Sequence, residues 1–292
     1  MSHHVKDKLL VAALRLCALA SGSIVLLIVG LLIFEAWPAL SPAGEIGVVG
    51  FVDDPSWHPI EGKFNLLPMV VASLLAMIGA MLLAVPLGLA SALFCSWYAP
   101  AWLANIYRRV LELLAGVPSV VYGFWGLVVL VPLIGQVRAP GASLLTGVLI
   151  LAVMVLPTVA LLSEAAITAV PRSVVNAAAA LAISRWSTIV RVVLPTARGG
   201  IGTACLLAAG RAVGETMAVL TVTGNVVQTP NSIFDPVRAL TSNIALEMGY
   251  AFGPHRAALF VTGLILLVVV LVLVAVAEWV SRGALRQGVT HT

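Results

Sequence analysis

Long uncharged apolar stretches separated by short polar segments dominate this chain. They cover residues 16–34, 66–97, 113–137, 139–163, 199–234 and 257–277, and only the fifth is interrupted by charged residues. A helix needs about 20 predominantly apolar residues to cross the hydrocarbon core of a bilayer. The pattern therefore predicts an all-α integral membrane protein with six transmembrane helices.

Composition agrees with this class. The chain has 292 residues, of which 61% are hydrophobic and 10% charged, whereas soluble domains carry about 25% charged residues. The net charge of +4 does not indicate nucleic-acid binding, because membrane proteins carry excess Lys and Arg on their cytoplasmic side. The three cysteines are isolated in apolar segments, so we expect neither a disulfide framework nor a metal site.

The polar segments predict how the chain is organised. We expect a cytoplasmic N-terminus at 1–15, an uncleaved first membrane helix at 16–36 and a periplasmic loop at 37–65. A core of five further helices is expected at 66–280, followed by a cytoplasmic C-terminus at 281–292. Lys and Arg are concentrated in alternate polar segments, and these segments face the cytoplasm if the N-terminus does. Both termini are thus predicted to be cytoplasmic.

The segment from 171 to 200 contains four arginines and no acid. The arginines interrupt it too often for a membrane span, so we expect a loop with helical content that covers 171–198. Ser173 is the expected N-cap. The apolar residues that recur at roughly helical spacing are Val174, Leu181, Trp186, Ile189 and Val193. They predict one apolar face, which another protein, the lipid surface or the chain's own core must cover.

Within this segment, residues 176–195 resemble the cytoplasmic coupling loop of ABC importer permeases. The matching positions are Ala177, Ala178, Leu181, Trp186, Thr188, Ile189, Leu194 and Pro195. Two positions depart from that pattern, because Asn176 stands where the family has Glu and Ala182 where it has Gly. The runs at 112–133, 210–220 and 232–236, together with Gly224-Asn225, resemble the PstC family of permeases in phosphate-specific ABC importers.

The resemblance implies a type I ABC importer permease fold and a transport subunit for inorganic phosphate in the bacterial inner membrane. It also implies three partners: a second permease subunit (PstA-like), an ATPase dimer (PstB-like) and a periplasmic phosphate-binding protein (PstS-like). The chain has no phosphate-binding GxxxxGK[ST] motif. We therefore expect no cofactor on this chain and no enzymatic activity, with ATP-Mg bound by the partner ATPase. The residues implied in ATPase coupling are Asn176, Ala177, Ala178, Leu181, Ala182, Arg185 and Trp186.

The two departures lead to separate expectations. A Glu at position 176 would cap the helix start by reaching back to Ser173, whereas Asn176 keeps the hydrogen bonding without the charge. Ala182 lacks the conformational freedom of Gly. We therefore expect the two short helices of the family pattern to merge into one longer helix.

Arg211 and Glu215 are the candidates for a substrate path. A charge at the centre of a membrane helix costs about 2.5–3.5 kcal/mol on insertion scales and faces the bundle interior. At a spacing of four residues the two would share one helical face and pair, and an arginine offers several donors to phosphate oxygens. One hypothesis is that Glu215 holds Arg211 until phosphate competes for it. The alternative is a permanent ion pair that only locks two helices together.

Other polar residues are weaker candidates. Ser119, Tyr122 and Thr216 offer hydroxyls to the path, although such groups also bond to backbone carbonyls in membrane helices. Gly116, Pro118 and Gly123 are expected to shape a helix break. The carboxylates of Glu35, Glu164 and Glu278 are expected at solvated helix ends.

Alternative functions remain open at this point. One alternative is a permease for another oxyanion, molybdate or sulfate. Another, which the departures at Asn176 and Ala182 would fit, is a weakly coupled, permease-like phosphate sensor. A secondary transporter or channel would have no need for an arginine-rich coupling segment. An intramembrane enzyme would need a nucleophile and base, or a metal set, at crossing depth, and the sequence offers none.

Overall fold

The computed structural model describes residues 3–41, 46–54 and 56–289, and this part of the chain is almost entirely helical. It forms two compact units, one made of the described residues within 1–65 and 247–265, the other of those within 66–246 and 266–292. Six of the described helical segments are long and apolar enough to cross a membrane. They are Leu10–Leu40, Leu67–Tyr98, Ser119–Val137, Leu144–Thr168, Arg185–Gly214 and Gly253–Val276. The prediction of an all-α protein with six membrane helices is confirmed.

The smaller unit contains a short β-hairpin. It contains α1 (His3–Leu40), α2 (Gly47–Asp53), β1 (Trp57–His58), a 3₁₀ turn at Pro59–Glu61, β2 (Lys63–Phe64) and the first part of α13 (Gly253–Val289). β1 and β2 pair antiparallel, with Trp57 opposite Phe64, and both aromatic rings are buried. Glu247 joins this unit by accepting hydrogen bonds from the Trp57 indole (2.9 Å) and binding the His255 ring (2.8 Å).

The larger unit is built on three long helices. These are α3 (Leu67–Leu93), extended by a π-helical turn at Phe94–Tyr98, α7 (Leu144–Thr168) and α10 (Leu194–Gly214). α3 packs closely on α7, because a Cβ at Gly79 would lie 2.7 Å from Val148 and one at Gly88 would lie 2.8 Å from Val159. Small residues at such crossings let helix backbones approach in membrane proteins. α3, α7 and α10 share buried apolar clusters that form the core.

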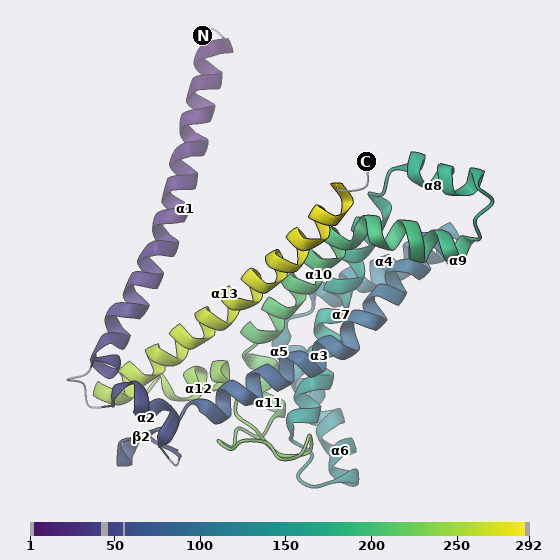
Figure 1. The fold of residues 1–292 in the computed structure, drawn as a ribbon. Helices are drawn as coiled ribbons and strands as arrows, with labels where there is room; N and C mark the ends of the chain where they lie inside the picture. Colours follow the sequence, from purple (N-terminus) through teal and green to yellow (C-terminus); the bar gives the residue numbers. More distant parts are fainter. Residues whose placement is uncertain (1–2, 42–45, 55, 290–292) are drawn as a thin grey trace. The chain divides into compact units, whose positions relative to one another are not determined.

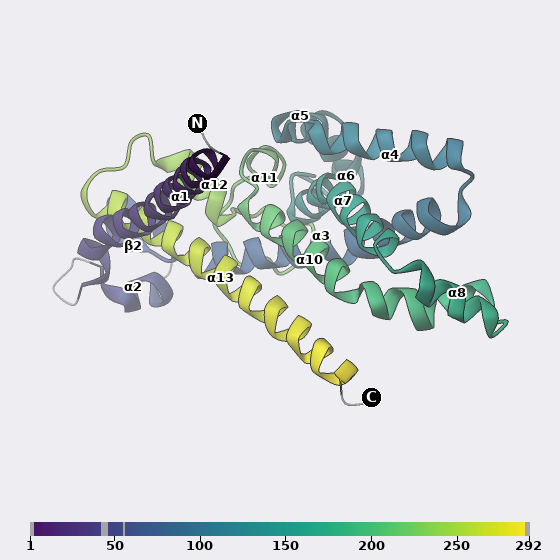
Figure 2. The same ribbon diagram turned by 90° about the horizontal axis from the view of Figure 1, so that it is seen from above.

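Shorter helices complete the larger unit. They are α4 (Ala101–Gly116), α5 (Ser119–Trp125), a π-helical turn at Gly126–Leu130, α6 (Val131–Val137), α8 (Arg172–Ala180), α9 (Arg185–Thr188), a π-helical turn at Ile189–Val193, α11 (Met217–Val222) and α12 (Leu240–Glu247). α8 and α9 lie at one end of this unit, while α6 and the loop before α12 lie at the other (Figure 1). Seen from above, α4 and α5 follow one another along one side of the unit (Figure 2).

The fifth crossing begins earlier than the sequence pattern predicts. The chain is continuously helical from Arg185 to Gly214, so the second half of the arginine-rich segment leads directly into the membrane helix. The π-helical turn explains how the helix passes Pro195: Leu194 donates its amide to the Ile189 carbonyl five residues back. Proline has no amide hydrogen to donate. The five-residue hydrogen bond just before Pro195 lets the helix continue past this missing donor.

Candidate coupling segment and substrate path

The arginine-rich segment forms two short helices separated by a turn. α8 begins at Arg172, after Pro171 as the N-cap residue, and the Val174 amide donates to the Pro171 carbonyl (3.1 Å). Ser173 thus lies inside the helix, and its predicted role as N-cap is wrong. Pro171 has the non-helical ψ of 132° that an N-cap residue adopts, and its side chain caps no amide of the helix. A Glu at position 176 would also lie too far along α8 to cap its start.

The predicted merger of the two helices is wrong as well. α8 ends at Ala180, and Ala182 adopts a left-handed conformation with φ +52°. The Ile183 amide donates to the Ala178 carbonyl (3.3 Å) and the Ala182 amide to the Ala179 carbonyl (3.0 Å). This is the hydrogen-bond pattern of a Schellman motif, which normally has glycine at its left-handed position. The two backbone hydrogen bonds and the Ser184 cap of α9 hold the turn despite the alanine Cβ.

The predicted apolar face is divided between two environments. Ile189 and Val193 are fully buried, and Val193 packs in a cluster with Ile167 and Val170. Leu181 and Trp186, in contrast, are 75% and 63% exposed. Arg185 lies over the Tyr98 ring, 5.1 Å from its centroid, and so ties α9 to the end of α3. Of the other coupling candidates, Asn176 and Ala177 are exposed and Ala178 is buried.

Arg211 and Glu215 do not share a helical face. α10 ends at Gly214, and Glu215 has an extended backbone with ψ 129°. Its carboxylate accepts a hydrogen bond from the Ala218 amide (3.1 Å) in the first turn of α11. Among the described residues, no ion pair joins it to Arg211, which is exposed. The predicted pairing fails because the helix breaks between the two residues.

Ser119 and Tyr122, two of the hydroxyl candidates, follow a second helix break, between α4 and α5. α4 ends at Gly116 and α5 begins at Ser119, so the predicted helix break falls at Val117 and Pro118. The Tyr122 hydroxyl donates to the Leu114 carbonyl (2.7 Å) and clamps the corner between the two helices. α5 and α11 are in direct contact, since a Cβ at Gly123 would lie 2.9 Å from the Ala218 Cα.

The structure therefore brings Ser119 and Tyr122 on one segment against the segment that carries Glu215 and Thr216. Ser119 and Thr216 are half-buried, and the Thr216 hydroxyl donates to the Gly214 carbonyl (3.3 Å). The Tyr122 hydroxyl is committed to the backbone, so it positions the corner rather than presenting a free donor.

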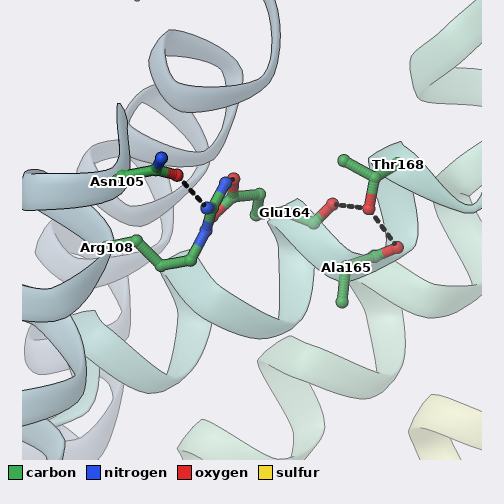
Figure 3. Close-up of polar contacts among 5 residues, drawn as sticks. All are labelled: Asn105, Arg108, Glu164, Ala165 and Thr168. Carbon is green, nitrogen blue, oxygen red and sulfur yellow. Dashed lines mark hydrogen bonds and ion pairs between the residues drawn. The ribbon is translucent and has the colours of Figure 1, made fainter. Parts of the chain in front are cut away.

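An ion pair between a half-buried arginine and a buried carboxylate is the feature that the sequence pattern missed. The Arg108 guanidinium on α4 donates to both carboxylate oxygens of Glu164 on α7, at 2.5 and 3.3 Å (Figure 3). Only 6% of the Glu164 side chain is exposed, so the expectation of a solvated carboxylate is wrong. The hydrogen bond from Arg108 to Glu164 raises the pKa of the Arg108 guanidinium. α7 continues beyond Ser163 to Thr168, and this extension carries Glu164 into the interface with α4.

The signal for this pair was present but ambiguous. Arg108 is followed by a second arginine, Arg109, and Glu112 lies one helical turn further along α4. Periodicity alone does not reveal which arginine faces a neighbouring helix. The buried positions Ala104 and Leu111 place Arg108 on the inner face of α4, while Arg109 is exposed.

The described residues thus form six helices long enough to cross a membrane, with the exposed α8 between the fourth and the fifth of them. The family model described as binding-protein-dependent transport system inner membrane component matches residues 84–286. The chain belongs to this family of ABC importer permeases and is a multi-pass inner membrane protein. In this family, ATP hydrolysis is carried out by a separate ATPase subunit.

Individual relatives agree over nearly the whole chain. The probable ABC transporter permease protein YqgH of Bacillus subtilis is 35% identical and aligns with 95% of this chain and 90% of its own length. The phosphate transport system permease protein PstC of Mesorhizobium japonicum is 33% identical over 92% of this chain and 86% of its own length. The PstC of Pasteurella multocida is 30% identical over 95% and 92%.

Solved structures share the fold. A chain of a bacterial ABC transporter involved in the import of the acidic polysaccharide alginate has a TM-score of 0.66 at 14% identity, covering 96% of this chain and 97% of that one. A chain of the MetNI methionine ABC transporter in an inward-facing conformation has a TM-score of 0.59 at 16% identity, covering 75% and 94%. The type I ABC importer permease fold is thereby confirmed.

Proposed function

We propose that this chain is the permease subunit of an ATP-driven importer of inorganic phosphate and forms half of its translocation path. The assignment of phosphate as the substrate rests on the similarity to phosphate permeases named PstC, at 30–33% identity over more than nine-tenths of the chain. The partners would be a PstA-like second permease, a PstB-like ATPase dimer and a PstS-like binding protein. Both chain termini and the α8–α9 hairpin would then face the cytoplasm.

The α8–α9 hairpin is the docking element for the ATPase in this proposal. Its exposed Leu181 and Trp186 offer an apolar contact, and buried aromatic anchors dominate the binding energy of many interfaces. The rest of the hairpin is already fixed, because Ile189 and Val193 are buried in the permease core. Movement of the docked ATPase would therefore be passed to α7 and α10 without an intervening flexible linker.

Arg211 is the proposed contact of the substrate. Its exposed guanidinium lies in the last turn of α10, and a partner permease would cover it in the complete transporter. Because Glu215 is bonded to the Ala218 amide, Arg211 does not have to be released from it before phosphate binds. Glu215 instead holds the start of α11, and the proposal adds the hydroxyls of Ser119 and Thr216 to the residues of the path.

Reconstitution tests the substrate. The chain, a second permease and the ATPase, placed in proteoliposomes with the binding protein outside them, should accumulate phosphate when ATP is enclosed with the ATPase. Molybdate and sulfate in tenfold excess should leave phosphate accumulation unchanged. If either anion inhibited phosphate accumulation and was itself taken up, that anion would be the substrate instead of phosphate. Uptake that does not require ATP would contradict an ATP-driven importer.

A tryptophan pair tests the docking element. Trp186→Ala should weaken ATPase binding by at least about 30-fold, since interface anchors contribute about 2 kcal/mol or more. Trp102→Ala is the matched control, because Trp102 lies on α4 and is similarly exposed, at 66% against 63%. Equal retention of the ATPase by both variants during co-purification would contradict docking at α8–α9.

A further inference from the structure

The Arg108–Glu164 ion pair lies outside both the proposed docking element, α8–α9, and the residues proposed for the substrate path. Burying a carboxylate is costly unless it is paired and hydrogen-bonded, and Glu164 is both buried and paired. A third hydrogen bond from the Arg108 guanidinium, to the Asn105 side chain (3.0 Å), fixes the orientation of its planar group (Figure 3). The two hydrogen bonds to the Glu164 carboxylate fix both the distance and the angle between the guanidinium and carboxylate planes.

On one side, the pair is attached to the coupling segment. Glu164 lies in the last turns of α7, just before α8 begins at Arg172. The Thr168 hydroxyl donates to the carbonyls of Glu164 (2.9 Å) and Ala165 (3.1 Å), which ties the end of α7 back onto the turn that carries Glu164. Val170, just after this end, packs with Val193 on the far side of the hairpin.

On the other side, the pair is attached to the substrate path. Arg108 lies on α4, whose end at Gly116 leads through Val117 and Pro118 into α5. The Tyr122 hydroxyl, bonded to the Leu114 carbonyl, stiffens this corner. A displacement of α4 is therefore passed to Ser119 and to the contact between α5 and α11.

We propose that the Arg108–Glu164 pair is a rigid strut that makes α4 and α5 follow α7 when the α8–α9 hairpin is displaced, so that ATP turnover is converted into opening of the path. This inference rests on the proposed function. Arg108 and Glu164 are positioning residues in this proposal, because they act through the helices α4 and α7 that carry them. The strut predicts that breaking the pair uncouples hydrolysis from transport in an assembled complex.

The direct measurement is the number of phosphate ions imported per ATP hydrolysed in proteoliposomes. Glu164→Gln and Arg108→Gln should each lower this ratio by about twofold to thirtyfold, the range found for residues that transmit coupling between sites. The reversed pair, Arg108→Glu with Glu164→Arg, should recover part of the loss. Arg109→Gln is the matched control, because the neighbouring Arg109 is exposed on the same helix.

A purely structural role would give a different result. Loss of packing would reduce complex yield, hydrolysis and uptake together, and the ratio in the surviving complexes would stay at the wild-type value. That outcome would overturn the strut. Arg108→Lys, which keeps the charge but not the two parallel bonds, covers the case in which the glutamine variants do not assemble, and it should show a smaller fall in the ratio.

A second measurement does not depend on the substrate. Spin labels at exposed Ala179 on α8 and Val121 on α5, in a chain with its three cysteines replaced, should report one narrow distance with and without a non-hydrolysable ATP analogue. Glu164→Gln should broaden this distribution or shift it on nucleotide binding. A wild-type distance that changes with nucleotide would contradict a rigid strut, whereas failure of wild-type phosphate uptake would contradict only the proposed substrate.

Discussion

Two of the helix interruptions in the described part of the chain are held in different ways. Between α8 and α9 the turn is closed by backbone hydrogen bonds from Ala182 and Ile183, although its left-handed residue carries a Cβ. Between α10 and α11 the break is closed by a side chain, because the Glu215 carboxylate accepts the Ala218 amide. The first interruption is held mainly by backbone hydrogen bonds. The second is held by side-chain hydrogen bonds, which include one from the Thr241 hydroxyl to the Glu215 carbonyl (2.8 Å).

This difference shows why the two positions respond differently to sequence change. A turn held by backbone bonds accepts a departure from glycine at the cost of some strain, so its shape survives in this chain. A break held by a side chain requires a hydrogen-bond acceptor at that position. It also separates the acid from Arg211, which four residues of continuous helix would have brought into contact.

The largest expected effect is at the α10–α11 break. Arg211→Gln should lower phosphate uptake by about 10- to 150-fold, because hydrogen bonds to charged groups contribute about 1.5–3 kcal/mol. Uptake into proteoliposomes measures it, with complex assembly checked by size-exclusion chromatography. Wild-type uptake by an assembled Arg211→Gln complex would rule out its contact with the substrate.

Two variants of Glu215 separate the effect of its hydrogen bond from the effect of its charge at the same break. Glu215→Ala should destabilise α11 by about 0.5–2 kcal/mol, the usual cost of losing a helix-capping acceptor. Glu215→Gln should retain most of this stability, since its amide oxygen still accepts from the Ala218 amide. Hydrogen exchange at Ala218 measures both variants. Equal loss in the two would show that the negative charge, not the hydrogen bond, holds the break.

At the α8–α9 turn, Ala182→Gly should be stabilising. Removing the Cβ relieves left-handed strain of about 1–2 kcal/mol, and the greater freedom of glycine in the unfolded chain offsets about 0.4–1 kcal/mol of it. Slower hydrogen exchange at Ile183 would register the gain, and Ala182→Val should change exchange in the opposite direction. Faster exchange in the glycine variant would mean that other contacts impose the turn.

The smallest effect is expected from Asn176→Glu. Position 176 is exposed and lies beyond the first turn of α8, where the helix dipole has little influence, so stability should be unchanged. Affinity for the ATPase should rise by up to about fivefold, in line with exposed ion pairs of about 0.2–1 kcal/mol, and this gain should disappear at high salt. An unchanged affinity at low salt would make the charge at this position irrelevant.

Much of the fold follows from the one-dimensional pattern, because uncharged runs of the right length have few alternatives to a membrane helix. Local chemistry was less predictable. Glu164 follows an apolar run and was expected in solvent, but the length of α7 and the packing of α4 bury it against Arg108. Leu181 and Ile189 belong to the same apolar pattern, yet one is exposed and the other buried, because only the tertiary packing decides which residues the core can reach.

The sequence by itself determined the number and type of the membrane helices, the location of the arginine-rich segment and the residue types available to bind an oxyanion. These depend on composition and period, which act along the chain. The tertiary structure decided that α8 and α9 remain two helices, that Glu215 caps α11 instead of pairing with Arg211, and that Arg108 finds Glu164. Local hydrogen bonds set where these helices end, and the packing of α4 on α7 sets which arginine meets Glu164.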